Sequence, residues 1–200
     1  MRNKCSTCGT NSTEGERMKI NRVWAMPNKE TFKIKPIKEL LKRYIKGRWV
    51  DPYAGYNSPA TVQNDLNPDI KGLCFSHKEA LEFLKEQQTD SADGLLFDPP
   101  YSPRQLSESY KKFGLSVNMQ TTQSSYWSKC RKQIARIIKP EGICINFGWN
   151  SCGIGKKLGF KIIEILLISH GGSHNDTIVT VERKDIFNLK IAKERRNEKK

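Results

Sequence analysis

The chain has 200 residues, of which 35 are Lys or Arg and 21 are Asp or Glu, so its formal net charge is +14. This length and composition favour a single domain and exclude collagen-like, coiled-coil and disulfide-scaffold classes. The positive charge indicates a polyanionic partner, most simply nucleic acid. No stretch contains the roughly 20 apolar residues of a membrane helix, so no membrane association is predicted.

Both ends of the chain are polar. Residues 1–22 are rich in Ser, Thr, Asn and Gly and predict a poorly packed arm. Cys5 and Cys8 in this arm have the spacing of half a zinc knuckle, but no second Cys-x-x-Cys pair follows, and we predict free thiols and no metal. Six cysteines without a signal peptide indicate reduced thiols and a cytoplasmic location. Residues 184–200 predict a frayed basic tail, which leaves 23–183 as the folded domain.

Helical and strand patterns alternate between these ends. Pro36 begins a predicted helix in which Ile37, Leu40, Leu41 and Tyr44 share one face. The remaining pattern predicts helices over 77–88 and 126–138, a long polar loop over 102–122 with a helical turn near 105–112, and strands over 48–51, 61–66, 71–75, 94–98, 143–147, 160–169 and 177–183. The sequence therefore predicts an α/β sandwich with a mostly parallel sheet. The last strand is expected to be antiparallel, because the loop before it is too short for a crossover helix.

Two predicted strands end in an Asp-Pro pair. The first such stretch covers residues 49–52, and the second continues as Asp98-Pro99-Pro100-Tyr101. Two consecutive prolines remove two backbone N–H donors, so the Asp98 carboxylate and a proline carbonyl form a patch that only accepts hydrogen bonds. With the aromatic face of Tyr101 beside it, this patch suits a planar ring that carries an exocyclic amine. A strand end followed by a stacked tyrosine is the purely structural alternative.

The run Asp98-Pro99-Pro100-Tyr101 at the end of an apolar strand resembles the catalytic motif of amino-methyltransferases that use S-adenosylmethionine. It is most similar to the motif of DNA adenine-N6 methyltransferases, especially the small enzymes often encoded by phages and prophages. The resemblance covers roughly residues 24–183. It implies a Rossmann-like class I methyltransferase sandwich, S-adenosylmethionine as the cofactor and DNA as the partner. It makes Asp98, Pro99, Pro100 and Tyr101 the expected catalytic residues.

The same resemblance implies where the cofactor binds. Residues 51–55 are similar to the family's cofactor loop, Asp65 matches the acid that holds the ribose hydroxyls, and residues 25–32 match the segment beside the methionine end. The expected cofactor-binding residues are Asp51, Tyr53, Gly55, Asp65, Thr31 and Phe32.

The sequence departs from the family pattern at three points. Gly55 stands alone in the cofactor loop, and the short distance from it to Asp65 leaves little room for a helix between the two strands. Ser76 and His77 stand where an acid that contacts the adenine ring is expected. No separate target-recognition domain is visible, so a short or relaxed target is expected.

The resemblance implies direct methyl transfer to a base that has left the duplex. Asp98 and the carbonyl of Pro99 accept the N–H groups of the adenine amine while Tyr101 stacks on the ring, so that catalysis is by positioning. Methylation of cytosine C5 is disfavoured, because it needs a cysteine nucleophile, usually in a Pro-Cys pair, and the sequence contains no such pair.

Basic and amide side chains near the motif are candidates for contact with nucleic acid. The predicted loop over 102–122 directly follows the motif, the helix over 126–138 carries a basic stripe, and the loop over 170–176 joins the last two strands. The side chains expected to contact nucleic acid are Arg104, Lys111, Lys112, Asn118, Lys132, Arg136 and His174. A solvated surface explains the same charges. His170, His174 and Asp176 also resemble a metal cluster, but hairpin turn chemistry explains that loop more simply.

The sequence is also compatible with three other functions. Guanine-N2 methyltransferases that act on ribosomal RNA use a motif of the same type, so RNA is an alternative partner. Cytosine-N4 DNA methyltransferases have nearly the same chemistry. The non-enzymatic alternative is a basic nucleic-acid-binding module that has kept the fold, although the intact run from Asp98 to Tyr101 argues against it.

Overall fold

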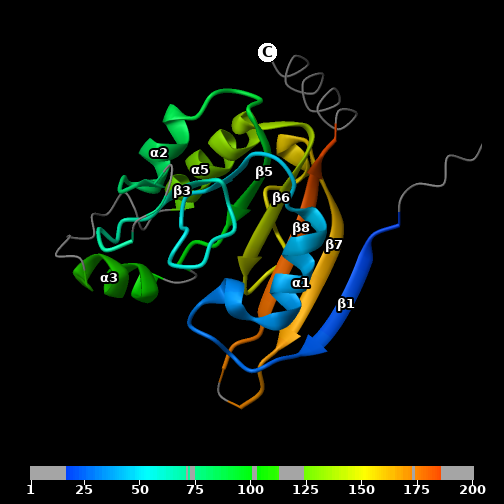
Figure 1. Cartoon of the computed structure of the whole chain (residues 1–200). Helices are drawn as coiled ribbons and strands as arrows, with labels where there is room; N and C mark the ends of the chain where they lie inside the picture. The colour runs from blue at the N-terminus through cyan, green and yellow to red at the C-terminus, as the bar shows by residue number, and fades with distance from the viewer. Residues whose placement is uncertain are drawn as a thin grey trace, which may run out of the picture.

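The computed structural model of the protein describes residues 17–70, 72, 75–100, 103–112, 124–172 and 174–185. In these residues eight strands form one sheet. The strands are β1 (Lys19–Trp24), β2 (Trp49–Asp51), β3 (Val62–Asn64), β4 (Phe75–Ser76), β5 (Ala92–Phe97), β6 (Ile138–Gly148), β7 (Phe160–Ser169) and β8 (Thr177–Lys184). Their order across the sheet is β1-β7-β8-β6-β5-β2-β3-β4 (Figure 1).

Neighbouring strands of this sheet are parallel except where β8 is involved. β8 runs antiparallel to both of its neighbours, with Val181 opposite Ile145 of β6 and Val179 opposite Leu166 of β7. The predicted mostly parallel sheet with an antiparallel last strand is therefore confirmed.

Helices cover both faces of the sheet (Figure 1). The helices of the described residues are η1 (Thr31–Lys33), α1 (Lys35–Tyr44), α2 (Ala80–Glu86), α3 (Pro103–Lys112), α5 (Ser124–Ile137) and η2 (Lys156–Leu158). Ile37, Leu40 and Leu41 of α1 are buried in one hydrophobic core, as the helical pattern predicts, whereas α2 and α5 contribute to a second core. Because successive strand residues point to opposite faces, Leu96 joins the first core and Leu95 joins the second.

Four elements differ from the predicted ones. β4 begins at Phe75, the last residue of the strand predicted over 71–75. β1 begins at Lys19, inside the stretch predicted as an arm, and pairs with β7 so that Trp24 lies opposite Ser169. β6 begins at Ile138 directly after α5, five residues before the strand predicted over 143–147, and its early part is irregular, with Glu141 at a φ of 64°. α3 is a full helix where the sequence predicts a loop with one helical turn.

Several predicted features lie outside the described residues. These are the pair Cys5 and Cys8, most of the predicted basic tail, and the candidate site residues Tyr101 and Asn118. Among the helices that the structure describes, none has the length and apolar character needed to cross a membrane.

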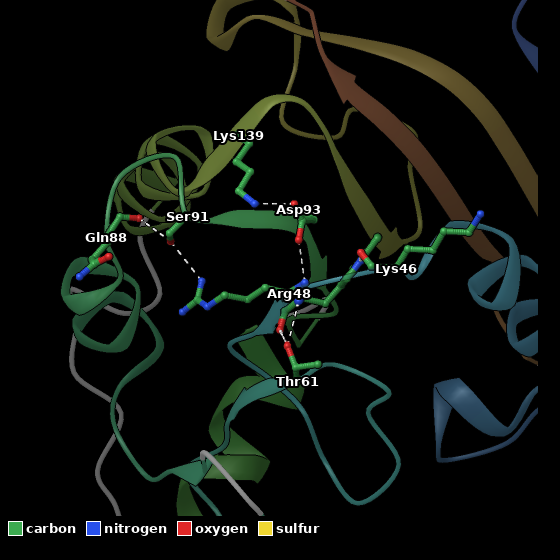
Figure 2. Close-up of polar contacts among 8 residues, drawn as sticks. Lys46, Arg48, Thr61, Gln88, Ser91, Asp93 and Lys139 are labelled. Atoms are coloured by element: carbon green, nitrogen blue, oxygen red, sulfur yellow. Dashed lines mark hydrogen bonds and ion pairs between the residues drawn. The ribbon is translucent and has the colours of Figure 1, made fainter.

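Figure 2 shows a set of polar contacts at the edge where the parallel strands begin. The Asp93 carboxylate accepts a hydrogen bond from the backbone N–H of Arg48 (2.8 Å) and forms an ion pair with Lys139 (2.6 Å). The Arg48 guanidinium donates to the Ser91 hydroxyl (3.1 Å). Gly47 permits this approach, because its φ is +78° and a Cβ there would lie 2.2 Å from the Asp93 carboxylate. The contacts join the beginnings of β2, β5 and β6.

Gly47→Ala is expected to lower the free energy of unfolding by about 1–3 kcal/mol. The added Cβ would collide with Asp93 in a backbone conformation that L-residues avoid. Urea denaturation followed by circular dichroism measures the loss. Gly172→Ala is the matched control, since its φ is +60° but no atom lies within 4 Å of an added Cβ. Equal losses in the two variants would contradict a role for the Asp93 contact.

Candidate active site

The carboxyl ends of the parallel strands surround a cavity of about 710 Å³. β5 ends at Phe97, and the next residues, Asp98, Pro99 and Pro100, line this cavity. Tyr101 lies outside the described residues. A buried apolar strand therefore delivers an acid and two prolines to a cavity large enough for a small-molecule ligand.

The loop between β2 and β3 forms the neighbouring wall. Tyr53, Gly55 and Asp65 line the cavity, and the loop contains turns but no helix, as the short spacing predicts. The Asp65 carboxylate accepts hydrogen bonds from the backbone N–H groups of Gly55 (3.0 Å) and Asn67 (2.8 Å). A carboxylate has about four lone-pair sites, so Asp65 keeps acceptor capacity for a ligand.

Asp51 lies behind this loop and is not part of the cavity lining. Its side chain is fully buried and accepts hydrogen bonds from the Ser58 hydroxyl (2.6 Å) and the Tyr53 backbone N–H (2.9 Å). Burial raises the pKa of Asp51 to about 7 despite these two bonds, and the carboxyl groups of Asp98 and Asp65 add to the increase. The structure therefore places Asp51 as a support of the loop.

The raised pKa of Asp51 predicts a pH dependence of stability. The ordinary pKa of this carboxyl is 3.8 and its pKa in the folded protein is about 7, so between these pH values the folded protein binds more protons than the unfolded chain. Asp51 therefore stabilises the folded protein fully below about pH 4. This stabilisation, on the order of a few kcal/mol, is lost as the pH rises through 7. Asp51→Asn keeps the shape and is expected to remove this slope. Urea midpoints of both proteins from about pH 4 to pH 8 test it; parallel curves would show that Asp51 ionises normally.

Thr31 and Phe32, two adjacent residues of η1, have different surroundings. Thr31 lines the cavity. Phe32 is buried in the core beneath α1, where its ring meets the Phe147 ring edge-on at a centroid separation of 5.5 Å. Phe32 therefore anchors η1 to the sheet, and its own side chain is not part of the cavity lining.

Glu79 is a cavity residue that the sequence analysis does not single out. It directly precedes α2 and lines the cavity. Its carboxylate accepts hydrogen bonds from the hydroxyls of Tyr110 in α3 (2.6 Å) and Tyr126 in α5. Burial, together with the nearby carboxylate, raises the pKa of Tyr126, so this hydroxyl stays protonated and donates. Glu79 thereby ties the two helices that follow the Asp98 segment to the cavity wall.

The residues predicted to contact nucleic acid do not form one group in the structure and lie on different elements. Arg104 is exposed on α3 and forms an ion pair with Glu108 (2.8 Å), and Lys111 is exposed on the same helix. Lys132 is exposed on α5. The side chain of Lys112 is outside the described part of the chain, as is Asn118.

Arg136 has backbone partners. Its guanidinium donates to the carbonyls of Leu84 (3.0 Å) and Lys85 (3.3 Å) and to the Thr89 hydroxyl (3.1 Å). These groups lie at the end of α2, where cations stabilise the unpaired carbonyls of a helix. α5 begins at the cavity with Tyr126 and leads into the start of β6, so its basic stripe runs away from the cavity toward the opposite edge of the sheet.

His174 lines a second cavity beside the first. The neighbouring His170 and Asp176, which together with His174 resemble a metal cluster in the sequence, are hydrogen-bonded to each other, and the His170 ring also bonds the Ala25 carbonyl and the Thr177 hydroxyl. In the described residues, no group of three His, Cys, Asp or Glu side chains is placed to hold a metal ion.

The sequence matches no protein-family model and no curated protein. Solved structures are similar in fold. TrmN from Thermus thermophilus has a TM-score of 0.50 and 15% identity over 76% of this chain and 49% of its own. The N-methyltransferase NodS from Bradyrhizobium japonicum WM9 has a TM-score of 0.48 and 9% identity over 76% of this chain and 93% of its own. The 1,6-didemethyltoxoflavin-N1-methyltransferase of Burkholderia thailandensis has a TM-score of 0.47 and 11% identity over 68% of this chain and 70% of its own.

These likenesses concern the fold. The chain spans about half the length of TrmN, at 49%. The order and directions of the strands, together with the similarity to TrmN, show a Rossmann-like class I methyltransferase fold, as the family resemblance implies.

Proposed function

We propose that this protein transfers a methyl group from S-adenosylmethionine to the exocyclic N6 of adenine in DNA. The observation that carries the proposal is that Asp98, Pro99 and Pro100 line the same cavity as Gly55 and Asp65. The two motifs that the sequence resemblance assigns to substrate and cofactor thus line one cavity, as a transfer between two bound molecules requires.

The residues at one side of the cavity fit this cofactor. Asp65 retains acceptor capacity for a pair of ribose hydroxyls, and Gly55 offers open space, because no atom lies within 4 Å of where its Cβ would stand. Glu79 adds a carboxyl group to the lining, which suits a cationic ligand. When bound, S-adenosylmethionine supplies a methyl group on a positively charged sulfur.

The residues at the other side fit an aromatic amine. The Asp98 carboxylate accepts a hydrogen bond from the amine and orients it, while Pro99 and Pro100 have no N–H to compete for the same groups. The adenine must leave the duplex to reach this cavity, which costs a few kcal/mol. The formal net charge of +14 supports binding to the phosphate backbone that carries the base.

A transfer assay with labelled S-adenosylmethionine tests the proposal. Single-stranded DNA, double-stranded DNA and ribosomal RNA serve as acceptors, and mass analysis of the digested nucleosides identifies the product. We expect N6-methyladenine from DNA. A product of N4-methylcytosine, or of N2-methylguanine from RNA, would replace the proposed substrate. Nucleic-acid binding without cofactor binding, the latter measured by calorimetry, would establish the non-enzymatic module.

A further inference from the structure

A second cavity of about 390 Å³ opens beside the first at the same edge of the sheet. Lys29, Thr31 and Gln105 line both cavities, so a polymer with one unit in the first cavity reaches the second directly. The rest of its wall includes Trp149 after β6 and His174 after β7. The transfer reaction proposed above leaves this second cavity unused.

Hydrogen bonds within the protein hold the walls of the second cavity in place. The Asp176 carboxylate accepts hydrogen bonds from the Ser169 hydroxyl (3.2 Å) and the His170 backbone N–H (3.2 Å). The buried ring of His170 donates from Nδ1 to the carbonyl of Ala25 (2.9 Å), and its Nε2 bonds the Thr177 hydroxyl (2.9 Å). The end of β1 is therefore fixed to the turn between β7 and β8, so the cavity is formed before a ligand arrives.

The second cavity presents the chemistry of a nucleotide site. Trp149 is 43% exposed, and an exposed indole at a cavity is a stacking surface for a base. Asn175 and His174 are exposed and line the same cavity, where an amide and an imidazole can bond the edge of a base. Lys29 is exposed at the junction of the two cavities and provides a cation for a phosphate.

Exposed aromatic side chains are concentrated at this edge. Trp24 is the last residue of β1, Tyr56 lies in the loop after β2, and Trp149 follows β6. All three are exposed and lie at or beyond the carboxyl ends of parallel strands. The indole of Trp24 lies close to Gly171, where a Cβ would come within 3.4 Å of its Nε1. Large exposed aromatic groups gathered at one edge mark a binding surface.

From these contacts we infer that the second cavity holds the nucleotide next to the target adenine, with its base stacked on Trp149. The inference rests on the proposed function and deepens it. The DNA strand is then bound with two successive bases unstacked, and sequence preference arises at the neighbouring base. A cavity built from the segment after β1, the Trp149 segment and the β7–β8 turn thus reads the base beside the target.

Binding of single-stranded oligonucleotides of about ten nucleotides with one adenine tests the inference by fluorescence anisotropy. Trp149→Ala is expected to weaken binding about tenfold, whereas Trp149→Phe, which keeps an aromatic face, stays close to wild type. Ile20→Ala is the matched control, because Ile20 is 59% exposed on β1 and lies outside the lining of both cavities. Affinity for S-adenosylmethionine is expected to be unchanged in all three variants.

A second arm uses oligonucleotides with an abasic site on either side of the adenine. If Trp149 stacks on the neighbouring base, one of these abasic sites weakens binding to the wild-type protein but has little further effect on Trp149→Ala. Additive losses, or wild-type affinity in Trp149→Ala, overturn the inference. If the inference fails in this way but adenine is still methylated, the proposed function stands. If no nucleic acid is methylated, the proposed function is refuted, and the effect of Trp149→Ala on oligonucleotide binding alone decides whether the second cavity stacks a base.

Discussion

Asp98→Ala is expected to lower the rate of methyl transfer at least about a hundredfold, while affinity for S-adenosylmethionine stays within about twofold of wild type. The reason is the division of the cavity: Asp98 follows β5, whereas the groups that suit the cofactor follow β2 and β3. The carboxylate that orients the amine acts on the transferring step and contributes little to holding the cofactor. Single-turnover transfer and calorimetric titration of the cofactor measure the two effects separately.

Asp65→Ala provides the matched comparison with the opposite expectation. It removes the carboxylate that bonds the Gly55 and Asn67 backbone N–H groups and faces the cavity. We expect cofactor affinity to fall about tenfold or more, because both the loop and the ligand lose an acceptor. If Asp98→Ala weakened cofactor binding as strongly as it weakened transfer, Asp98 would belong to the cofactor side of the cavity and its assignment would be wrong.

The central strands could be predicted because their side chains are apolar, which indicates that they are buried. Leu95, Leu96 and Phe97 are apolar in succession, since β5 is covered on both faces. Asp98 could be predicted for a related reason, because a parallel strand ends at the edge where ligands bind. Gly55 and Asp65, which the family resemblance assigns to the cofactor, follow β2 and β3 and line the same cavity.

β1 could not be predicted, because it shows no alternation of apolar and polar side chains. Its burial pattern is almost entirely exposed, and Lys19 and Arg22 look like residues of a solvated arm. What fixes this edge strand is the backbone ladder with β7, together with the Asn21 amide, which donates to Glu164 (3.3 Å). Backbone pairing has no signature in a single sequence.

The contacts of Glu79 and Arg136 within the protein could not be predicted from the sequence for a similar reason. The partners of Glu79 are Tyr110 and Tyr126, which are 31 and 47 positions away, so no local motif joins them. Arg136 resembles part of a phosphate-binding stripe, but it donates to carbonyls at the end of α2. Charge counted along one helix cannot show which backbone groups of another helix lie opposite.

One buried carboxylate fixes the segment that carries Trp149. Residues 149–159 bring the chain from the end of β6 to the start of β7, with only the short η2 between them. Glu182 of β8 is fully buried, and it accepts hydrogen bonds from the backbone N–H groups of Ile154 (2.6 Å) and Gly155 (3.0 Å) and from the Asn146 amide (2.9 Å). Burial raises the pKa of Glu182, and these donors oppose the increase.

Glu182→Ala is expected to lower the free energy of unfolding by about 3–5 kcal/mol. Two backbone donors, one of them buried and one partly buried, and one buried amide lose their acceptor, and a cavity replaces the side chain. Urea denaturation measures the loss. Because the same segment begins with Trp149, the variant is also expected to bind single-stranded DNA more weakly than wild type under conditions where it is fully folded.

Glu182→Gln separates the acceptor from the charge. The glutamine oxygen can keep the Ile154 N–H and the Asn146 amide, which bond one and the same oxygen of Glu182, and only the Gly155 N–H then faces the new NH₂ group, so a loss of about 1–2 kcal/mol is expected. A loss as large as that of Glu182→Ala would show that the negative charge itself holds the segment. Stability close to wild type in Glu182→Ala would mean instead that packing of the buried Ile154 side chain fixes the path of the chain. In that case Trp149 would keep its place and DNA binding would be unaffected.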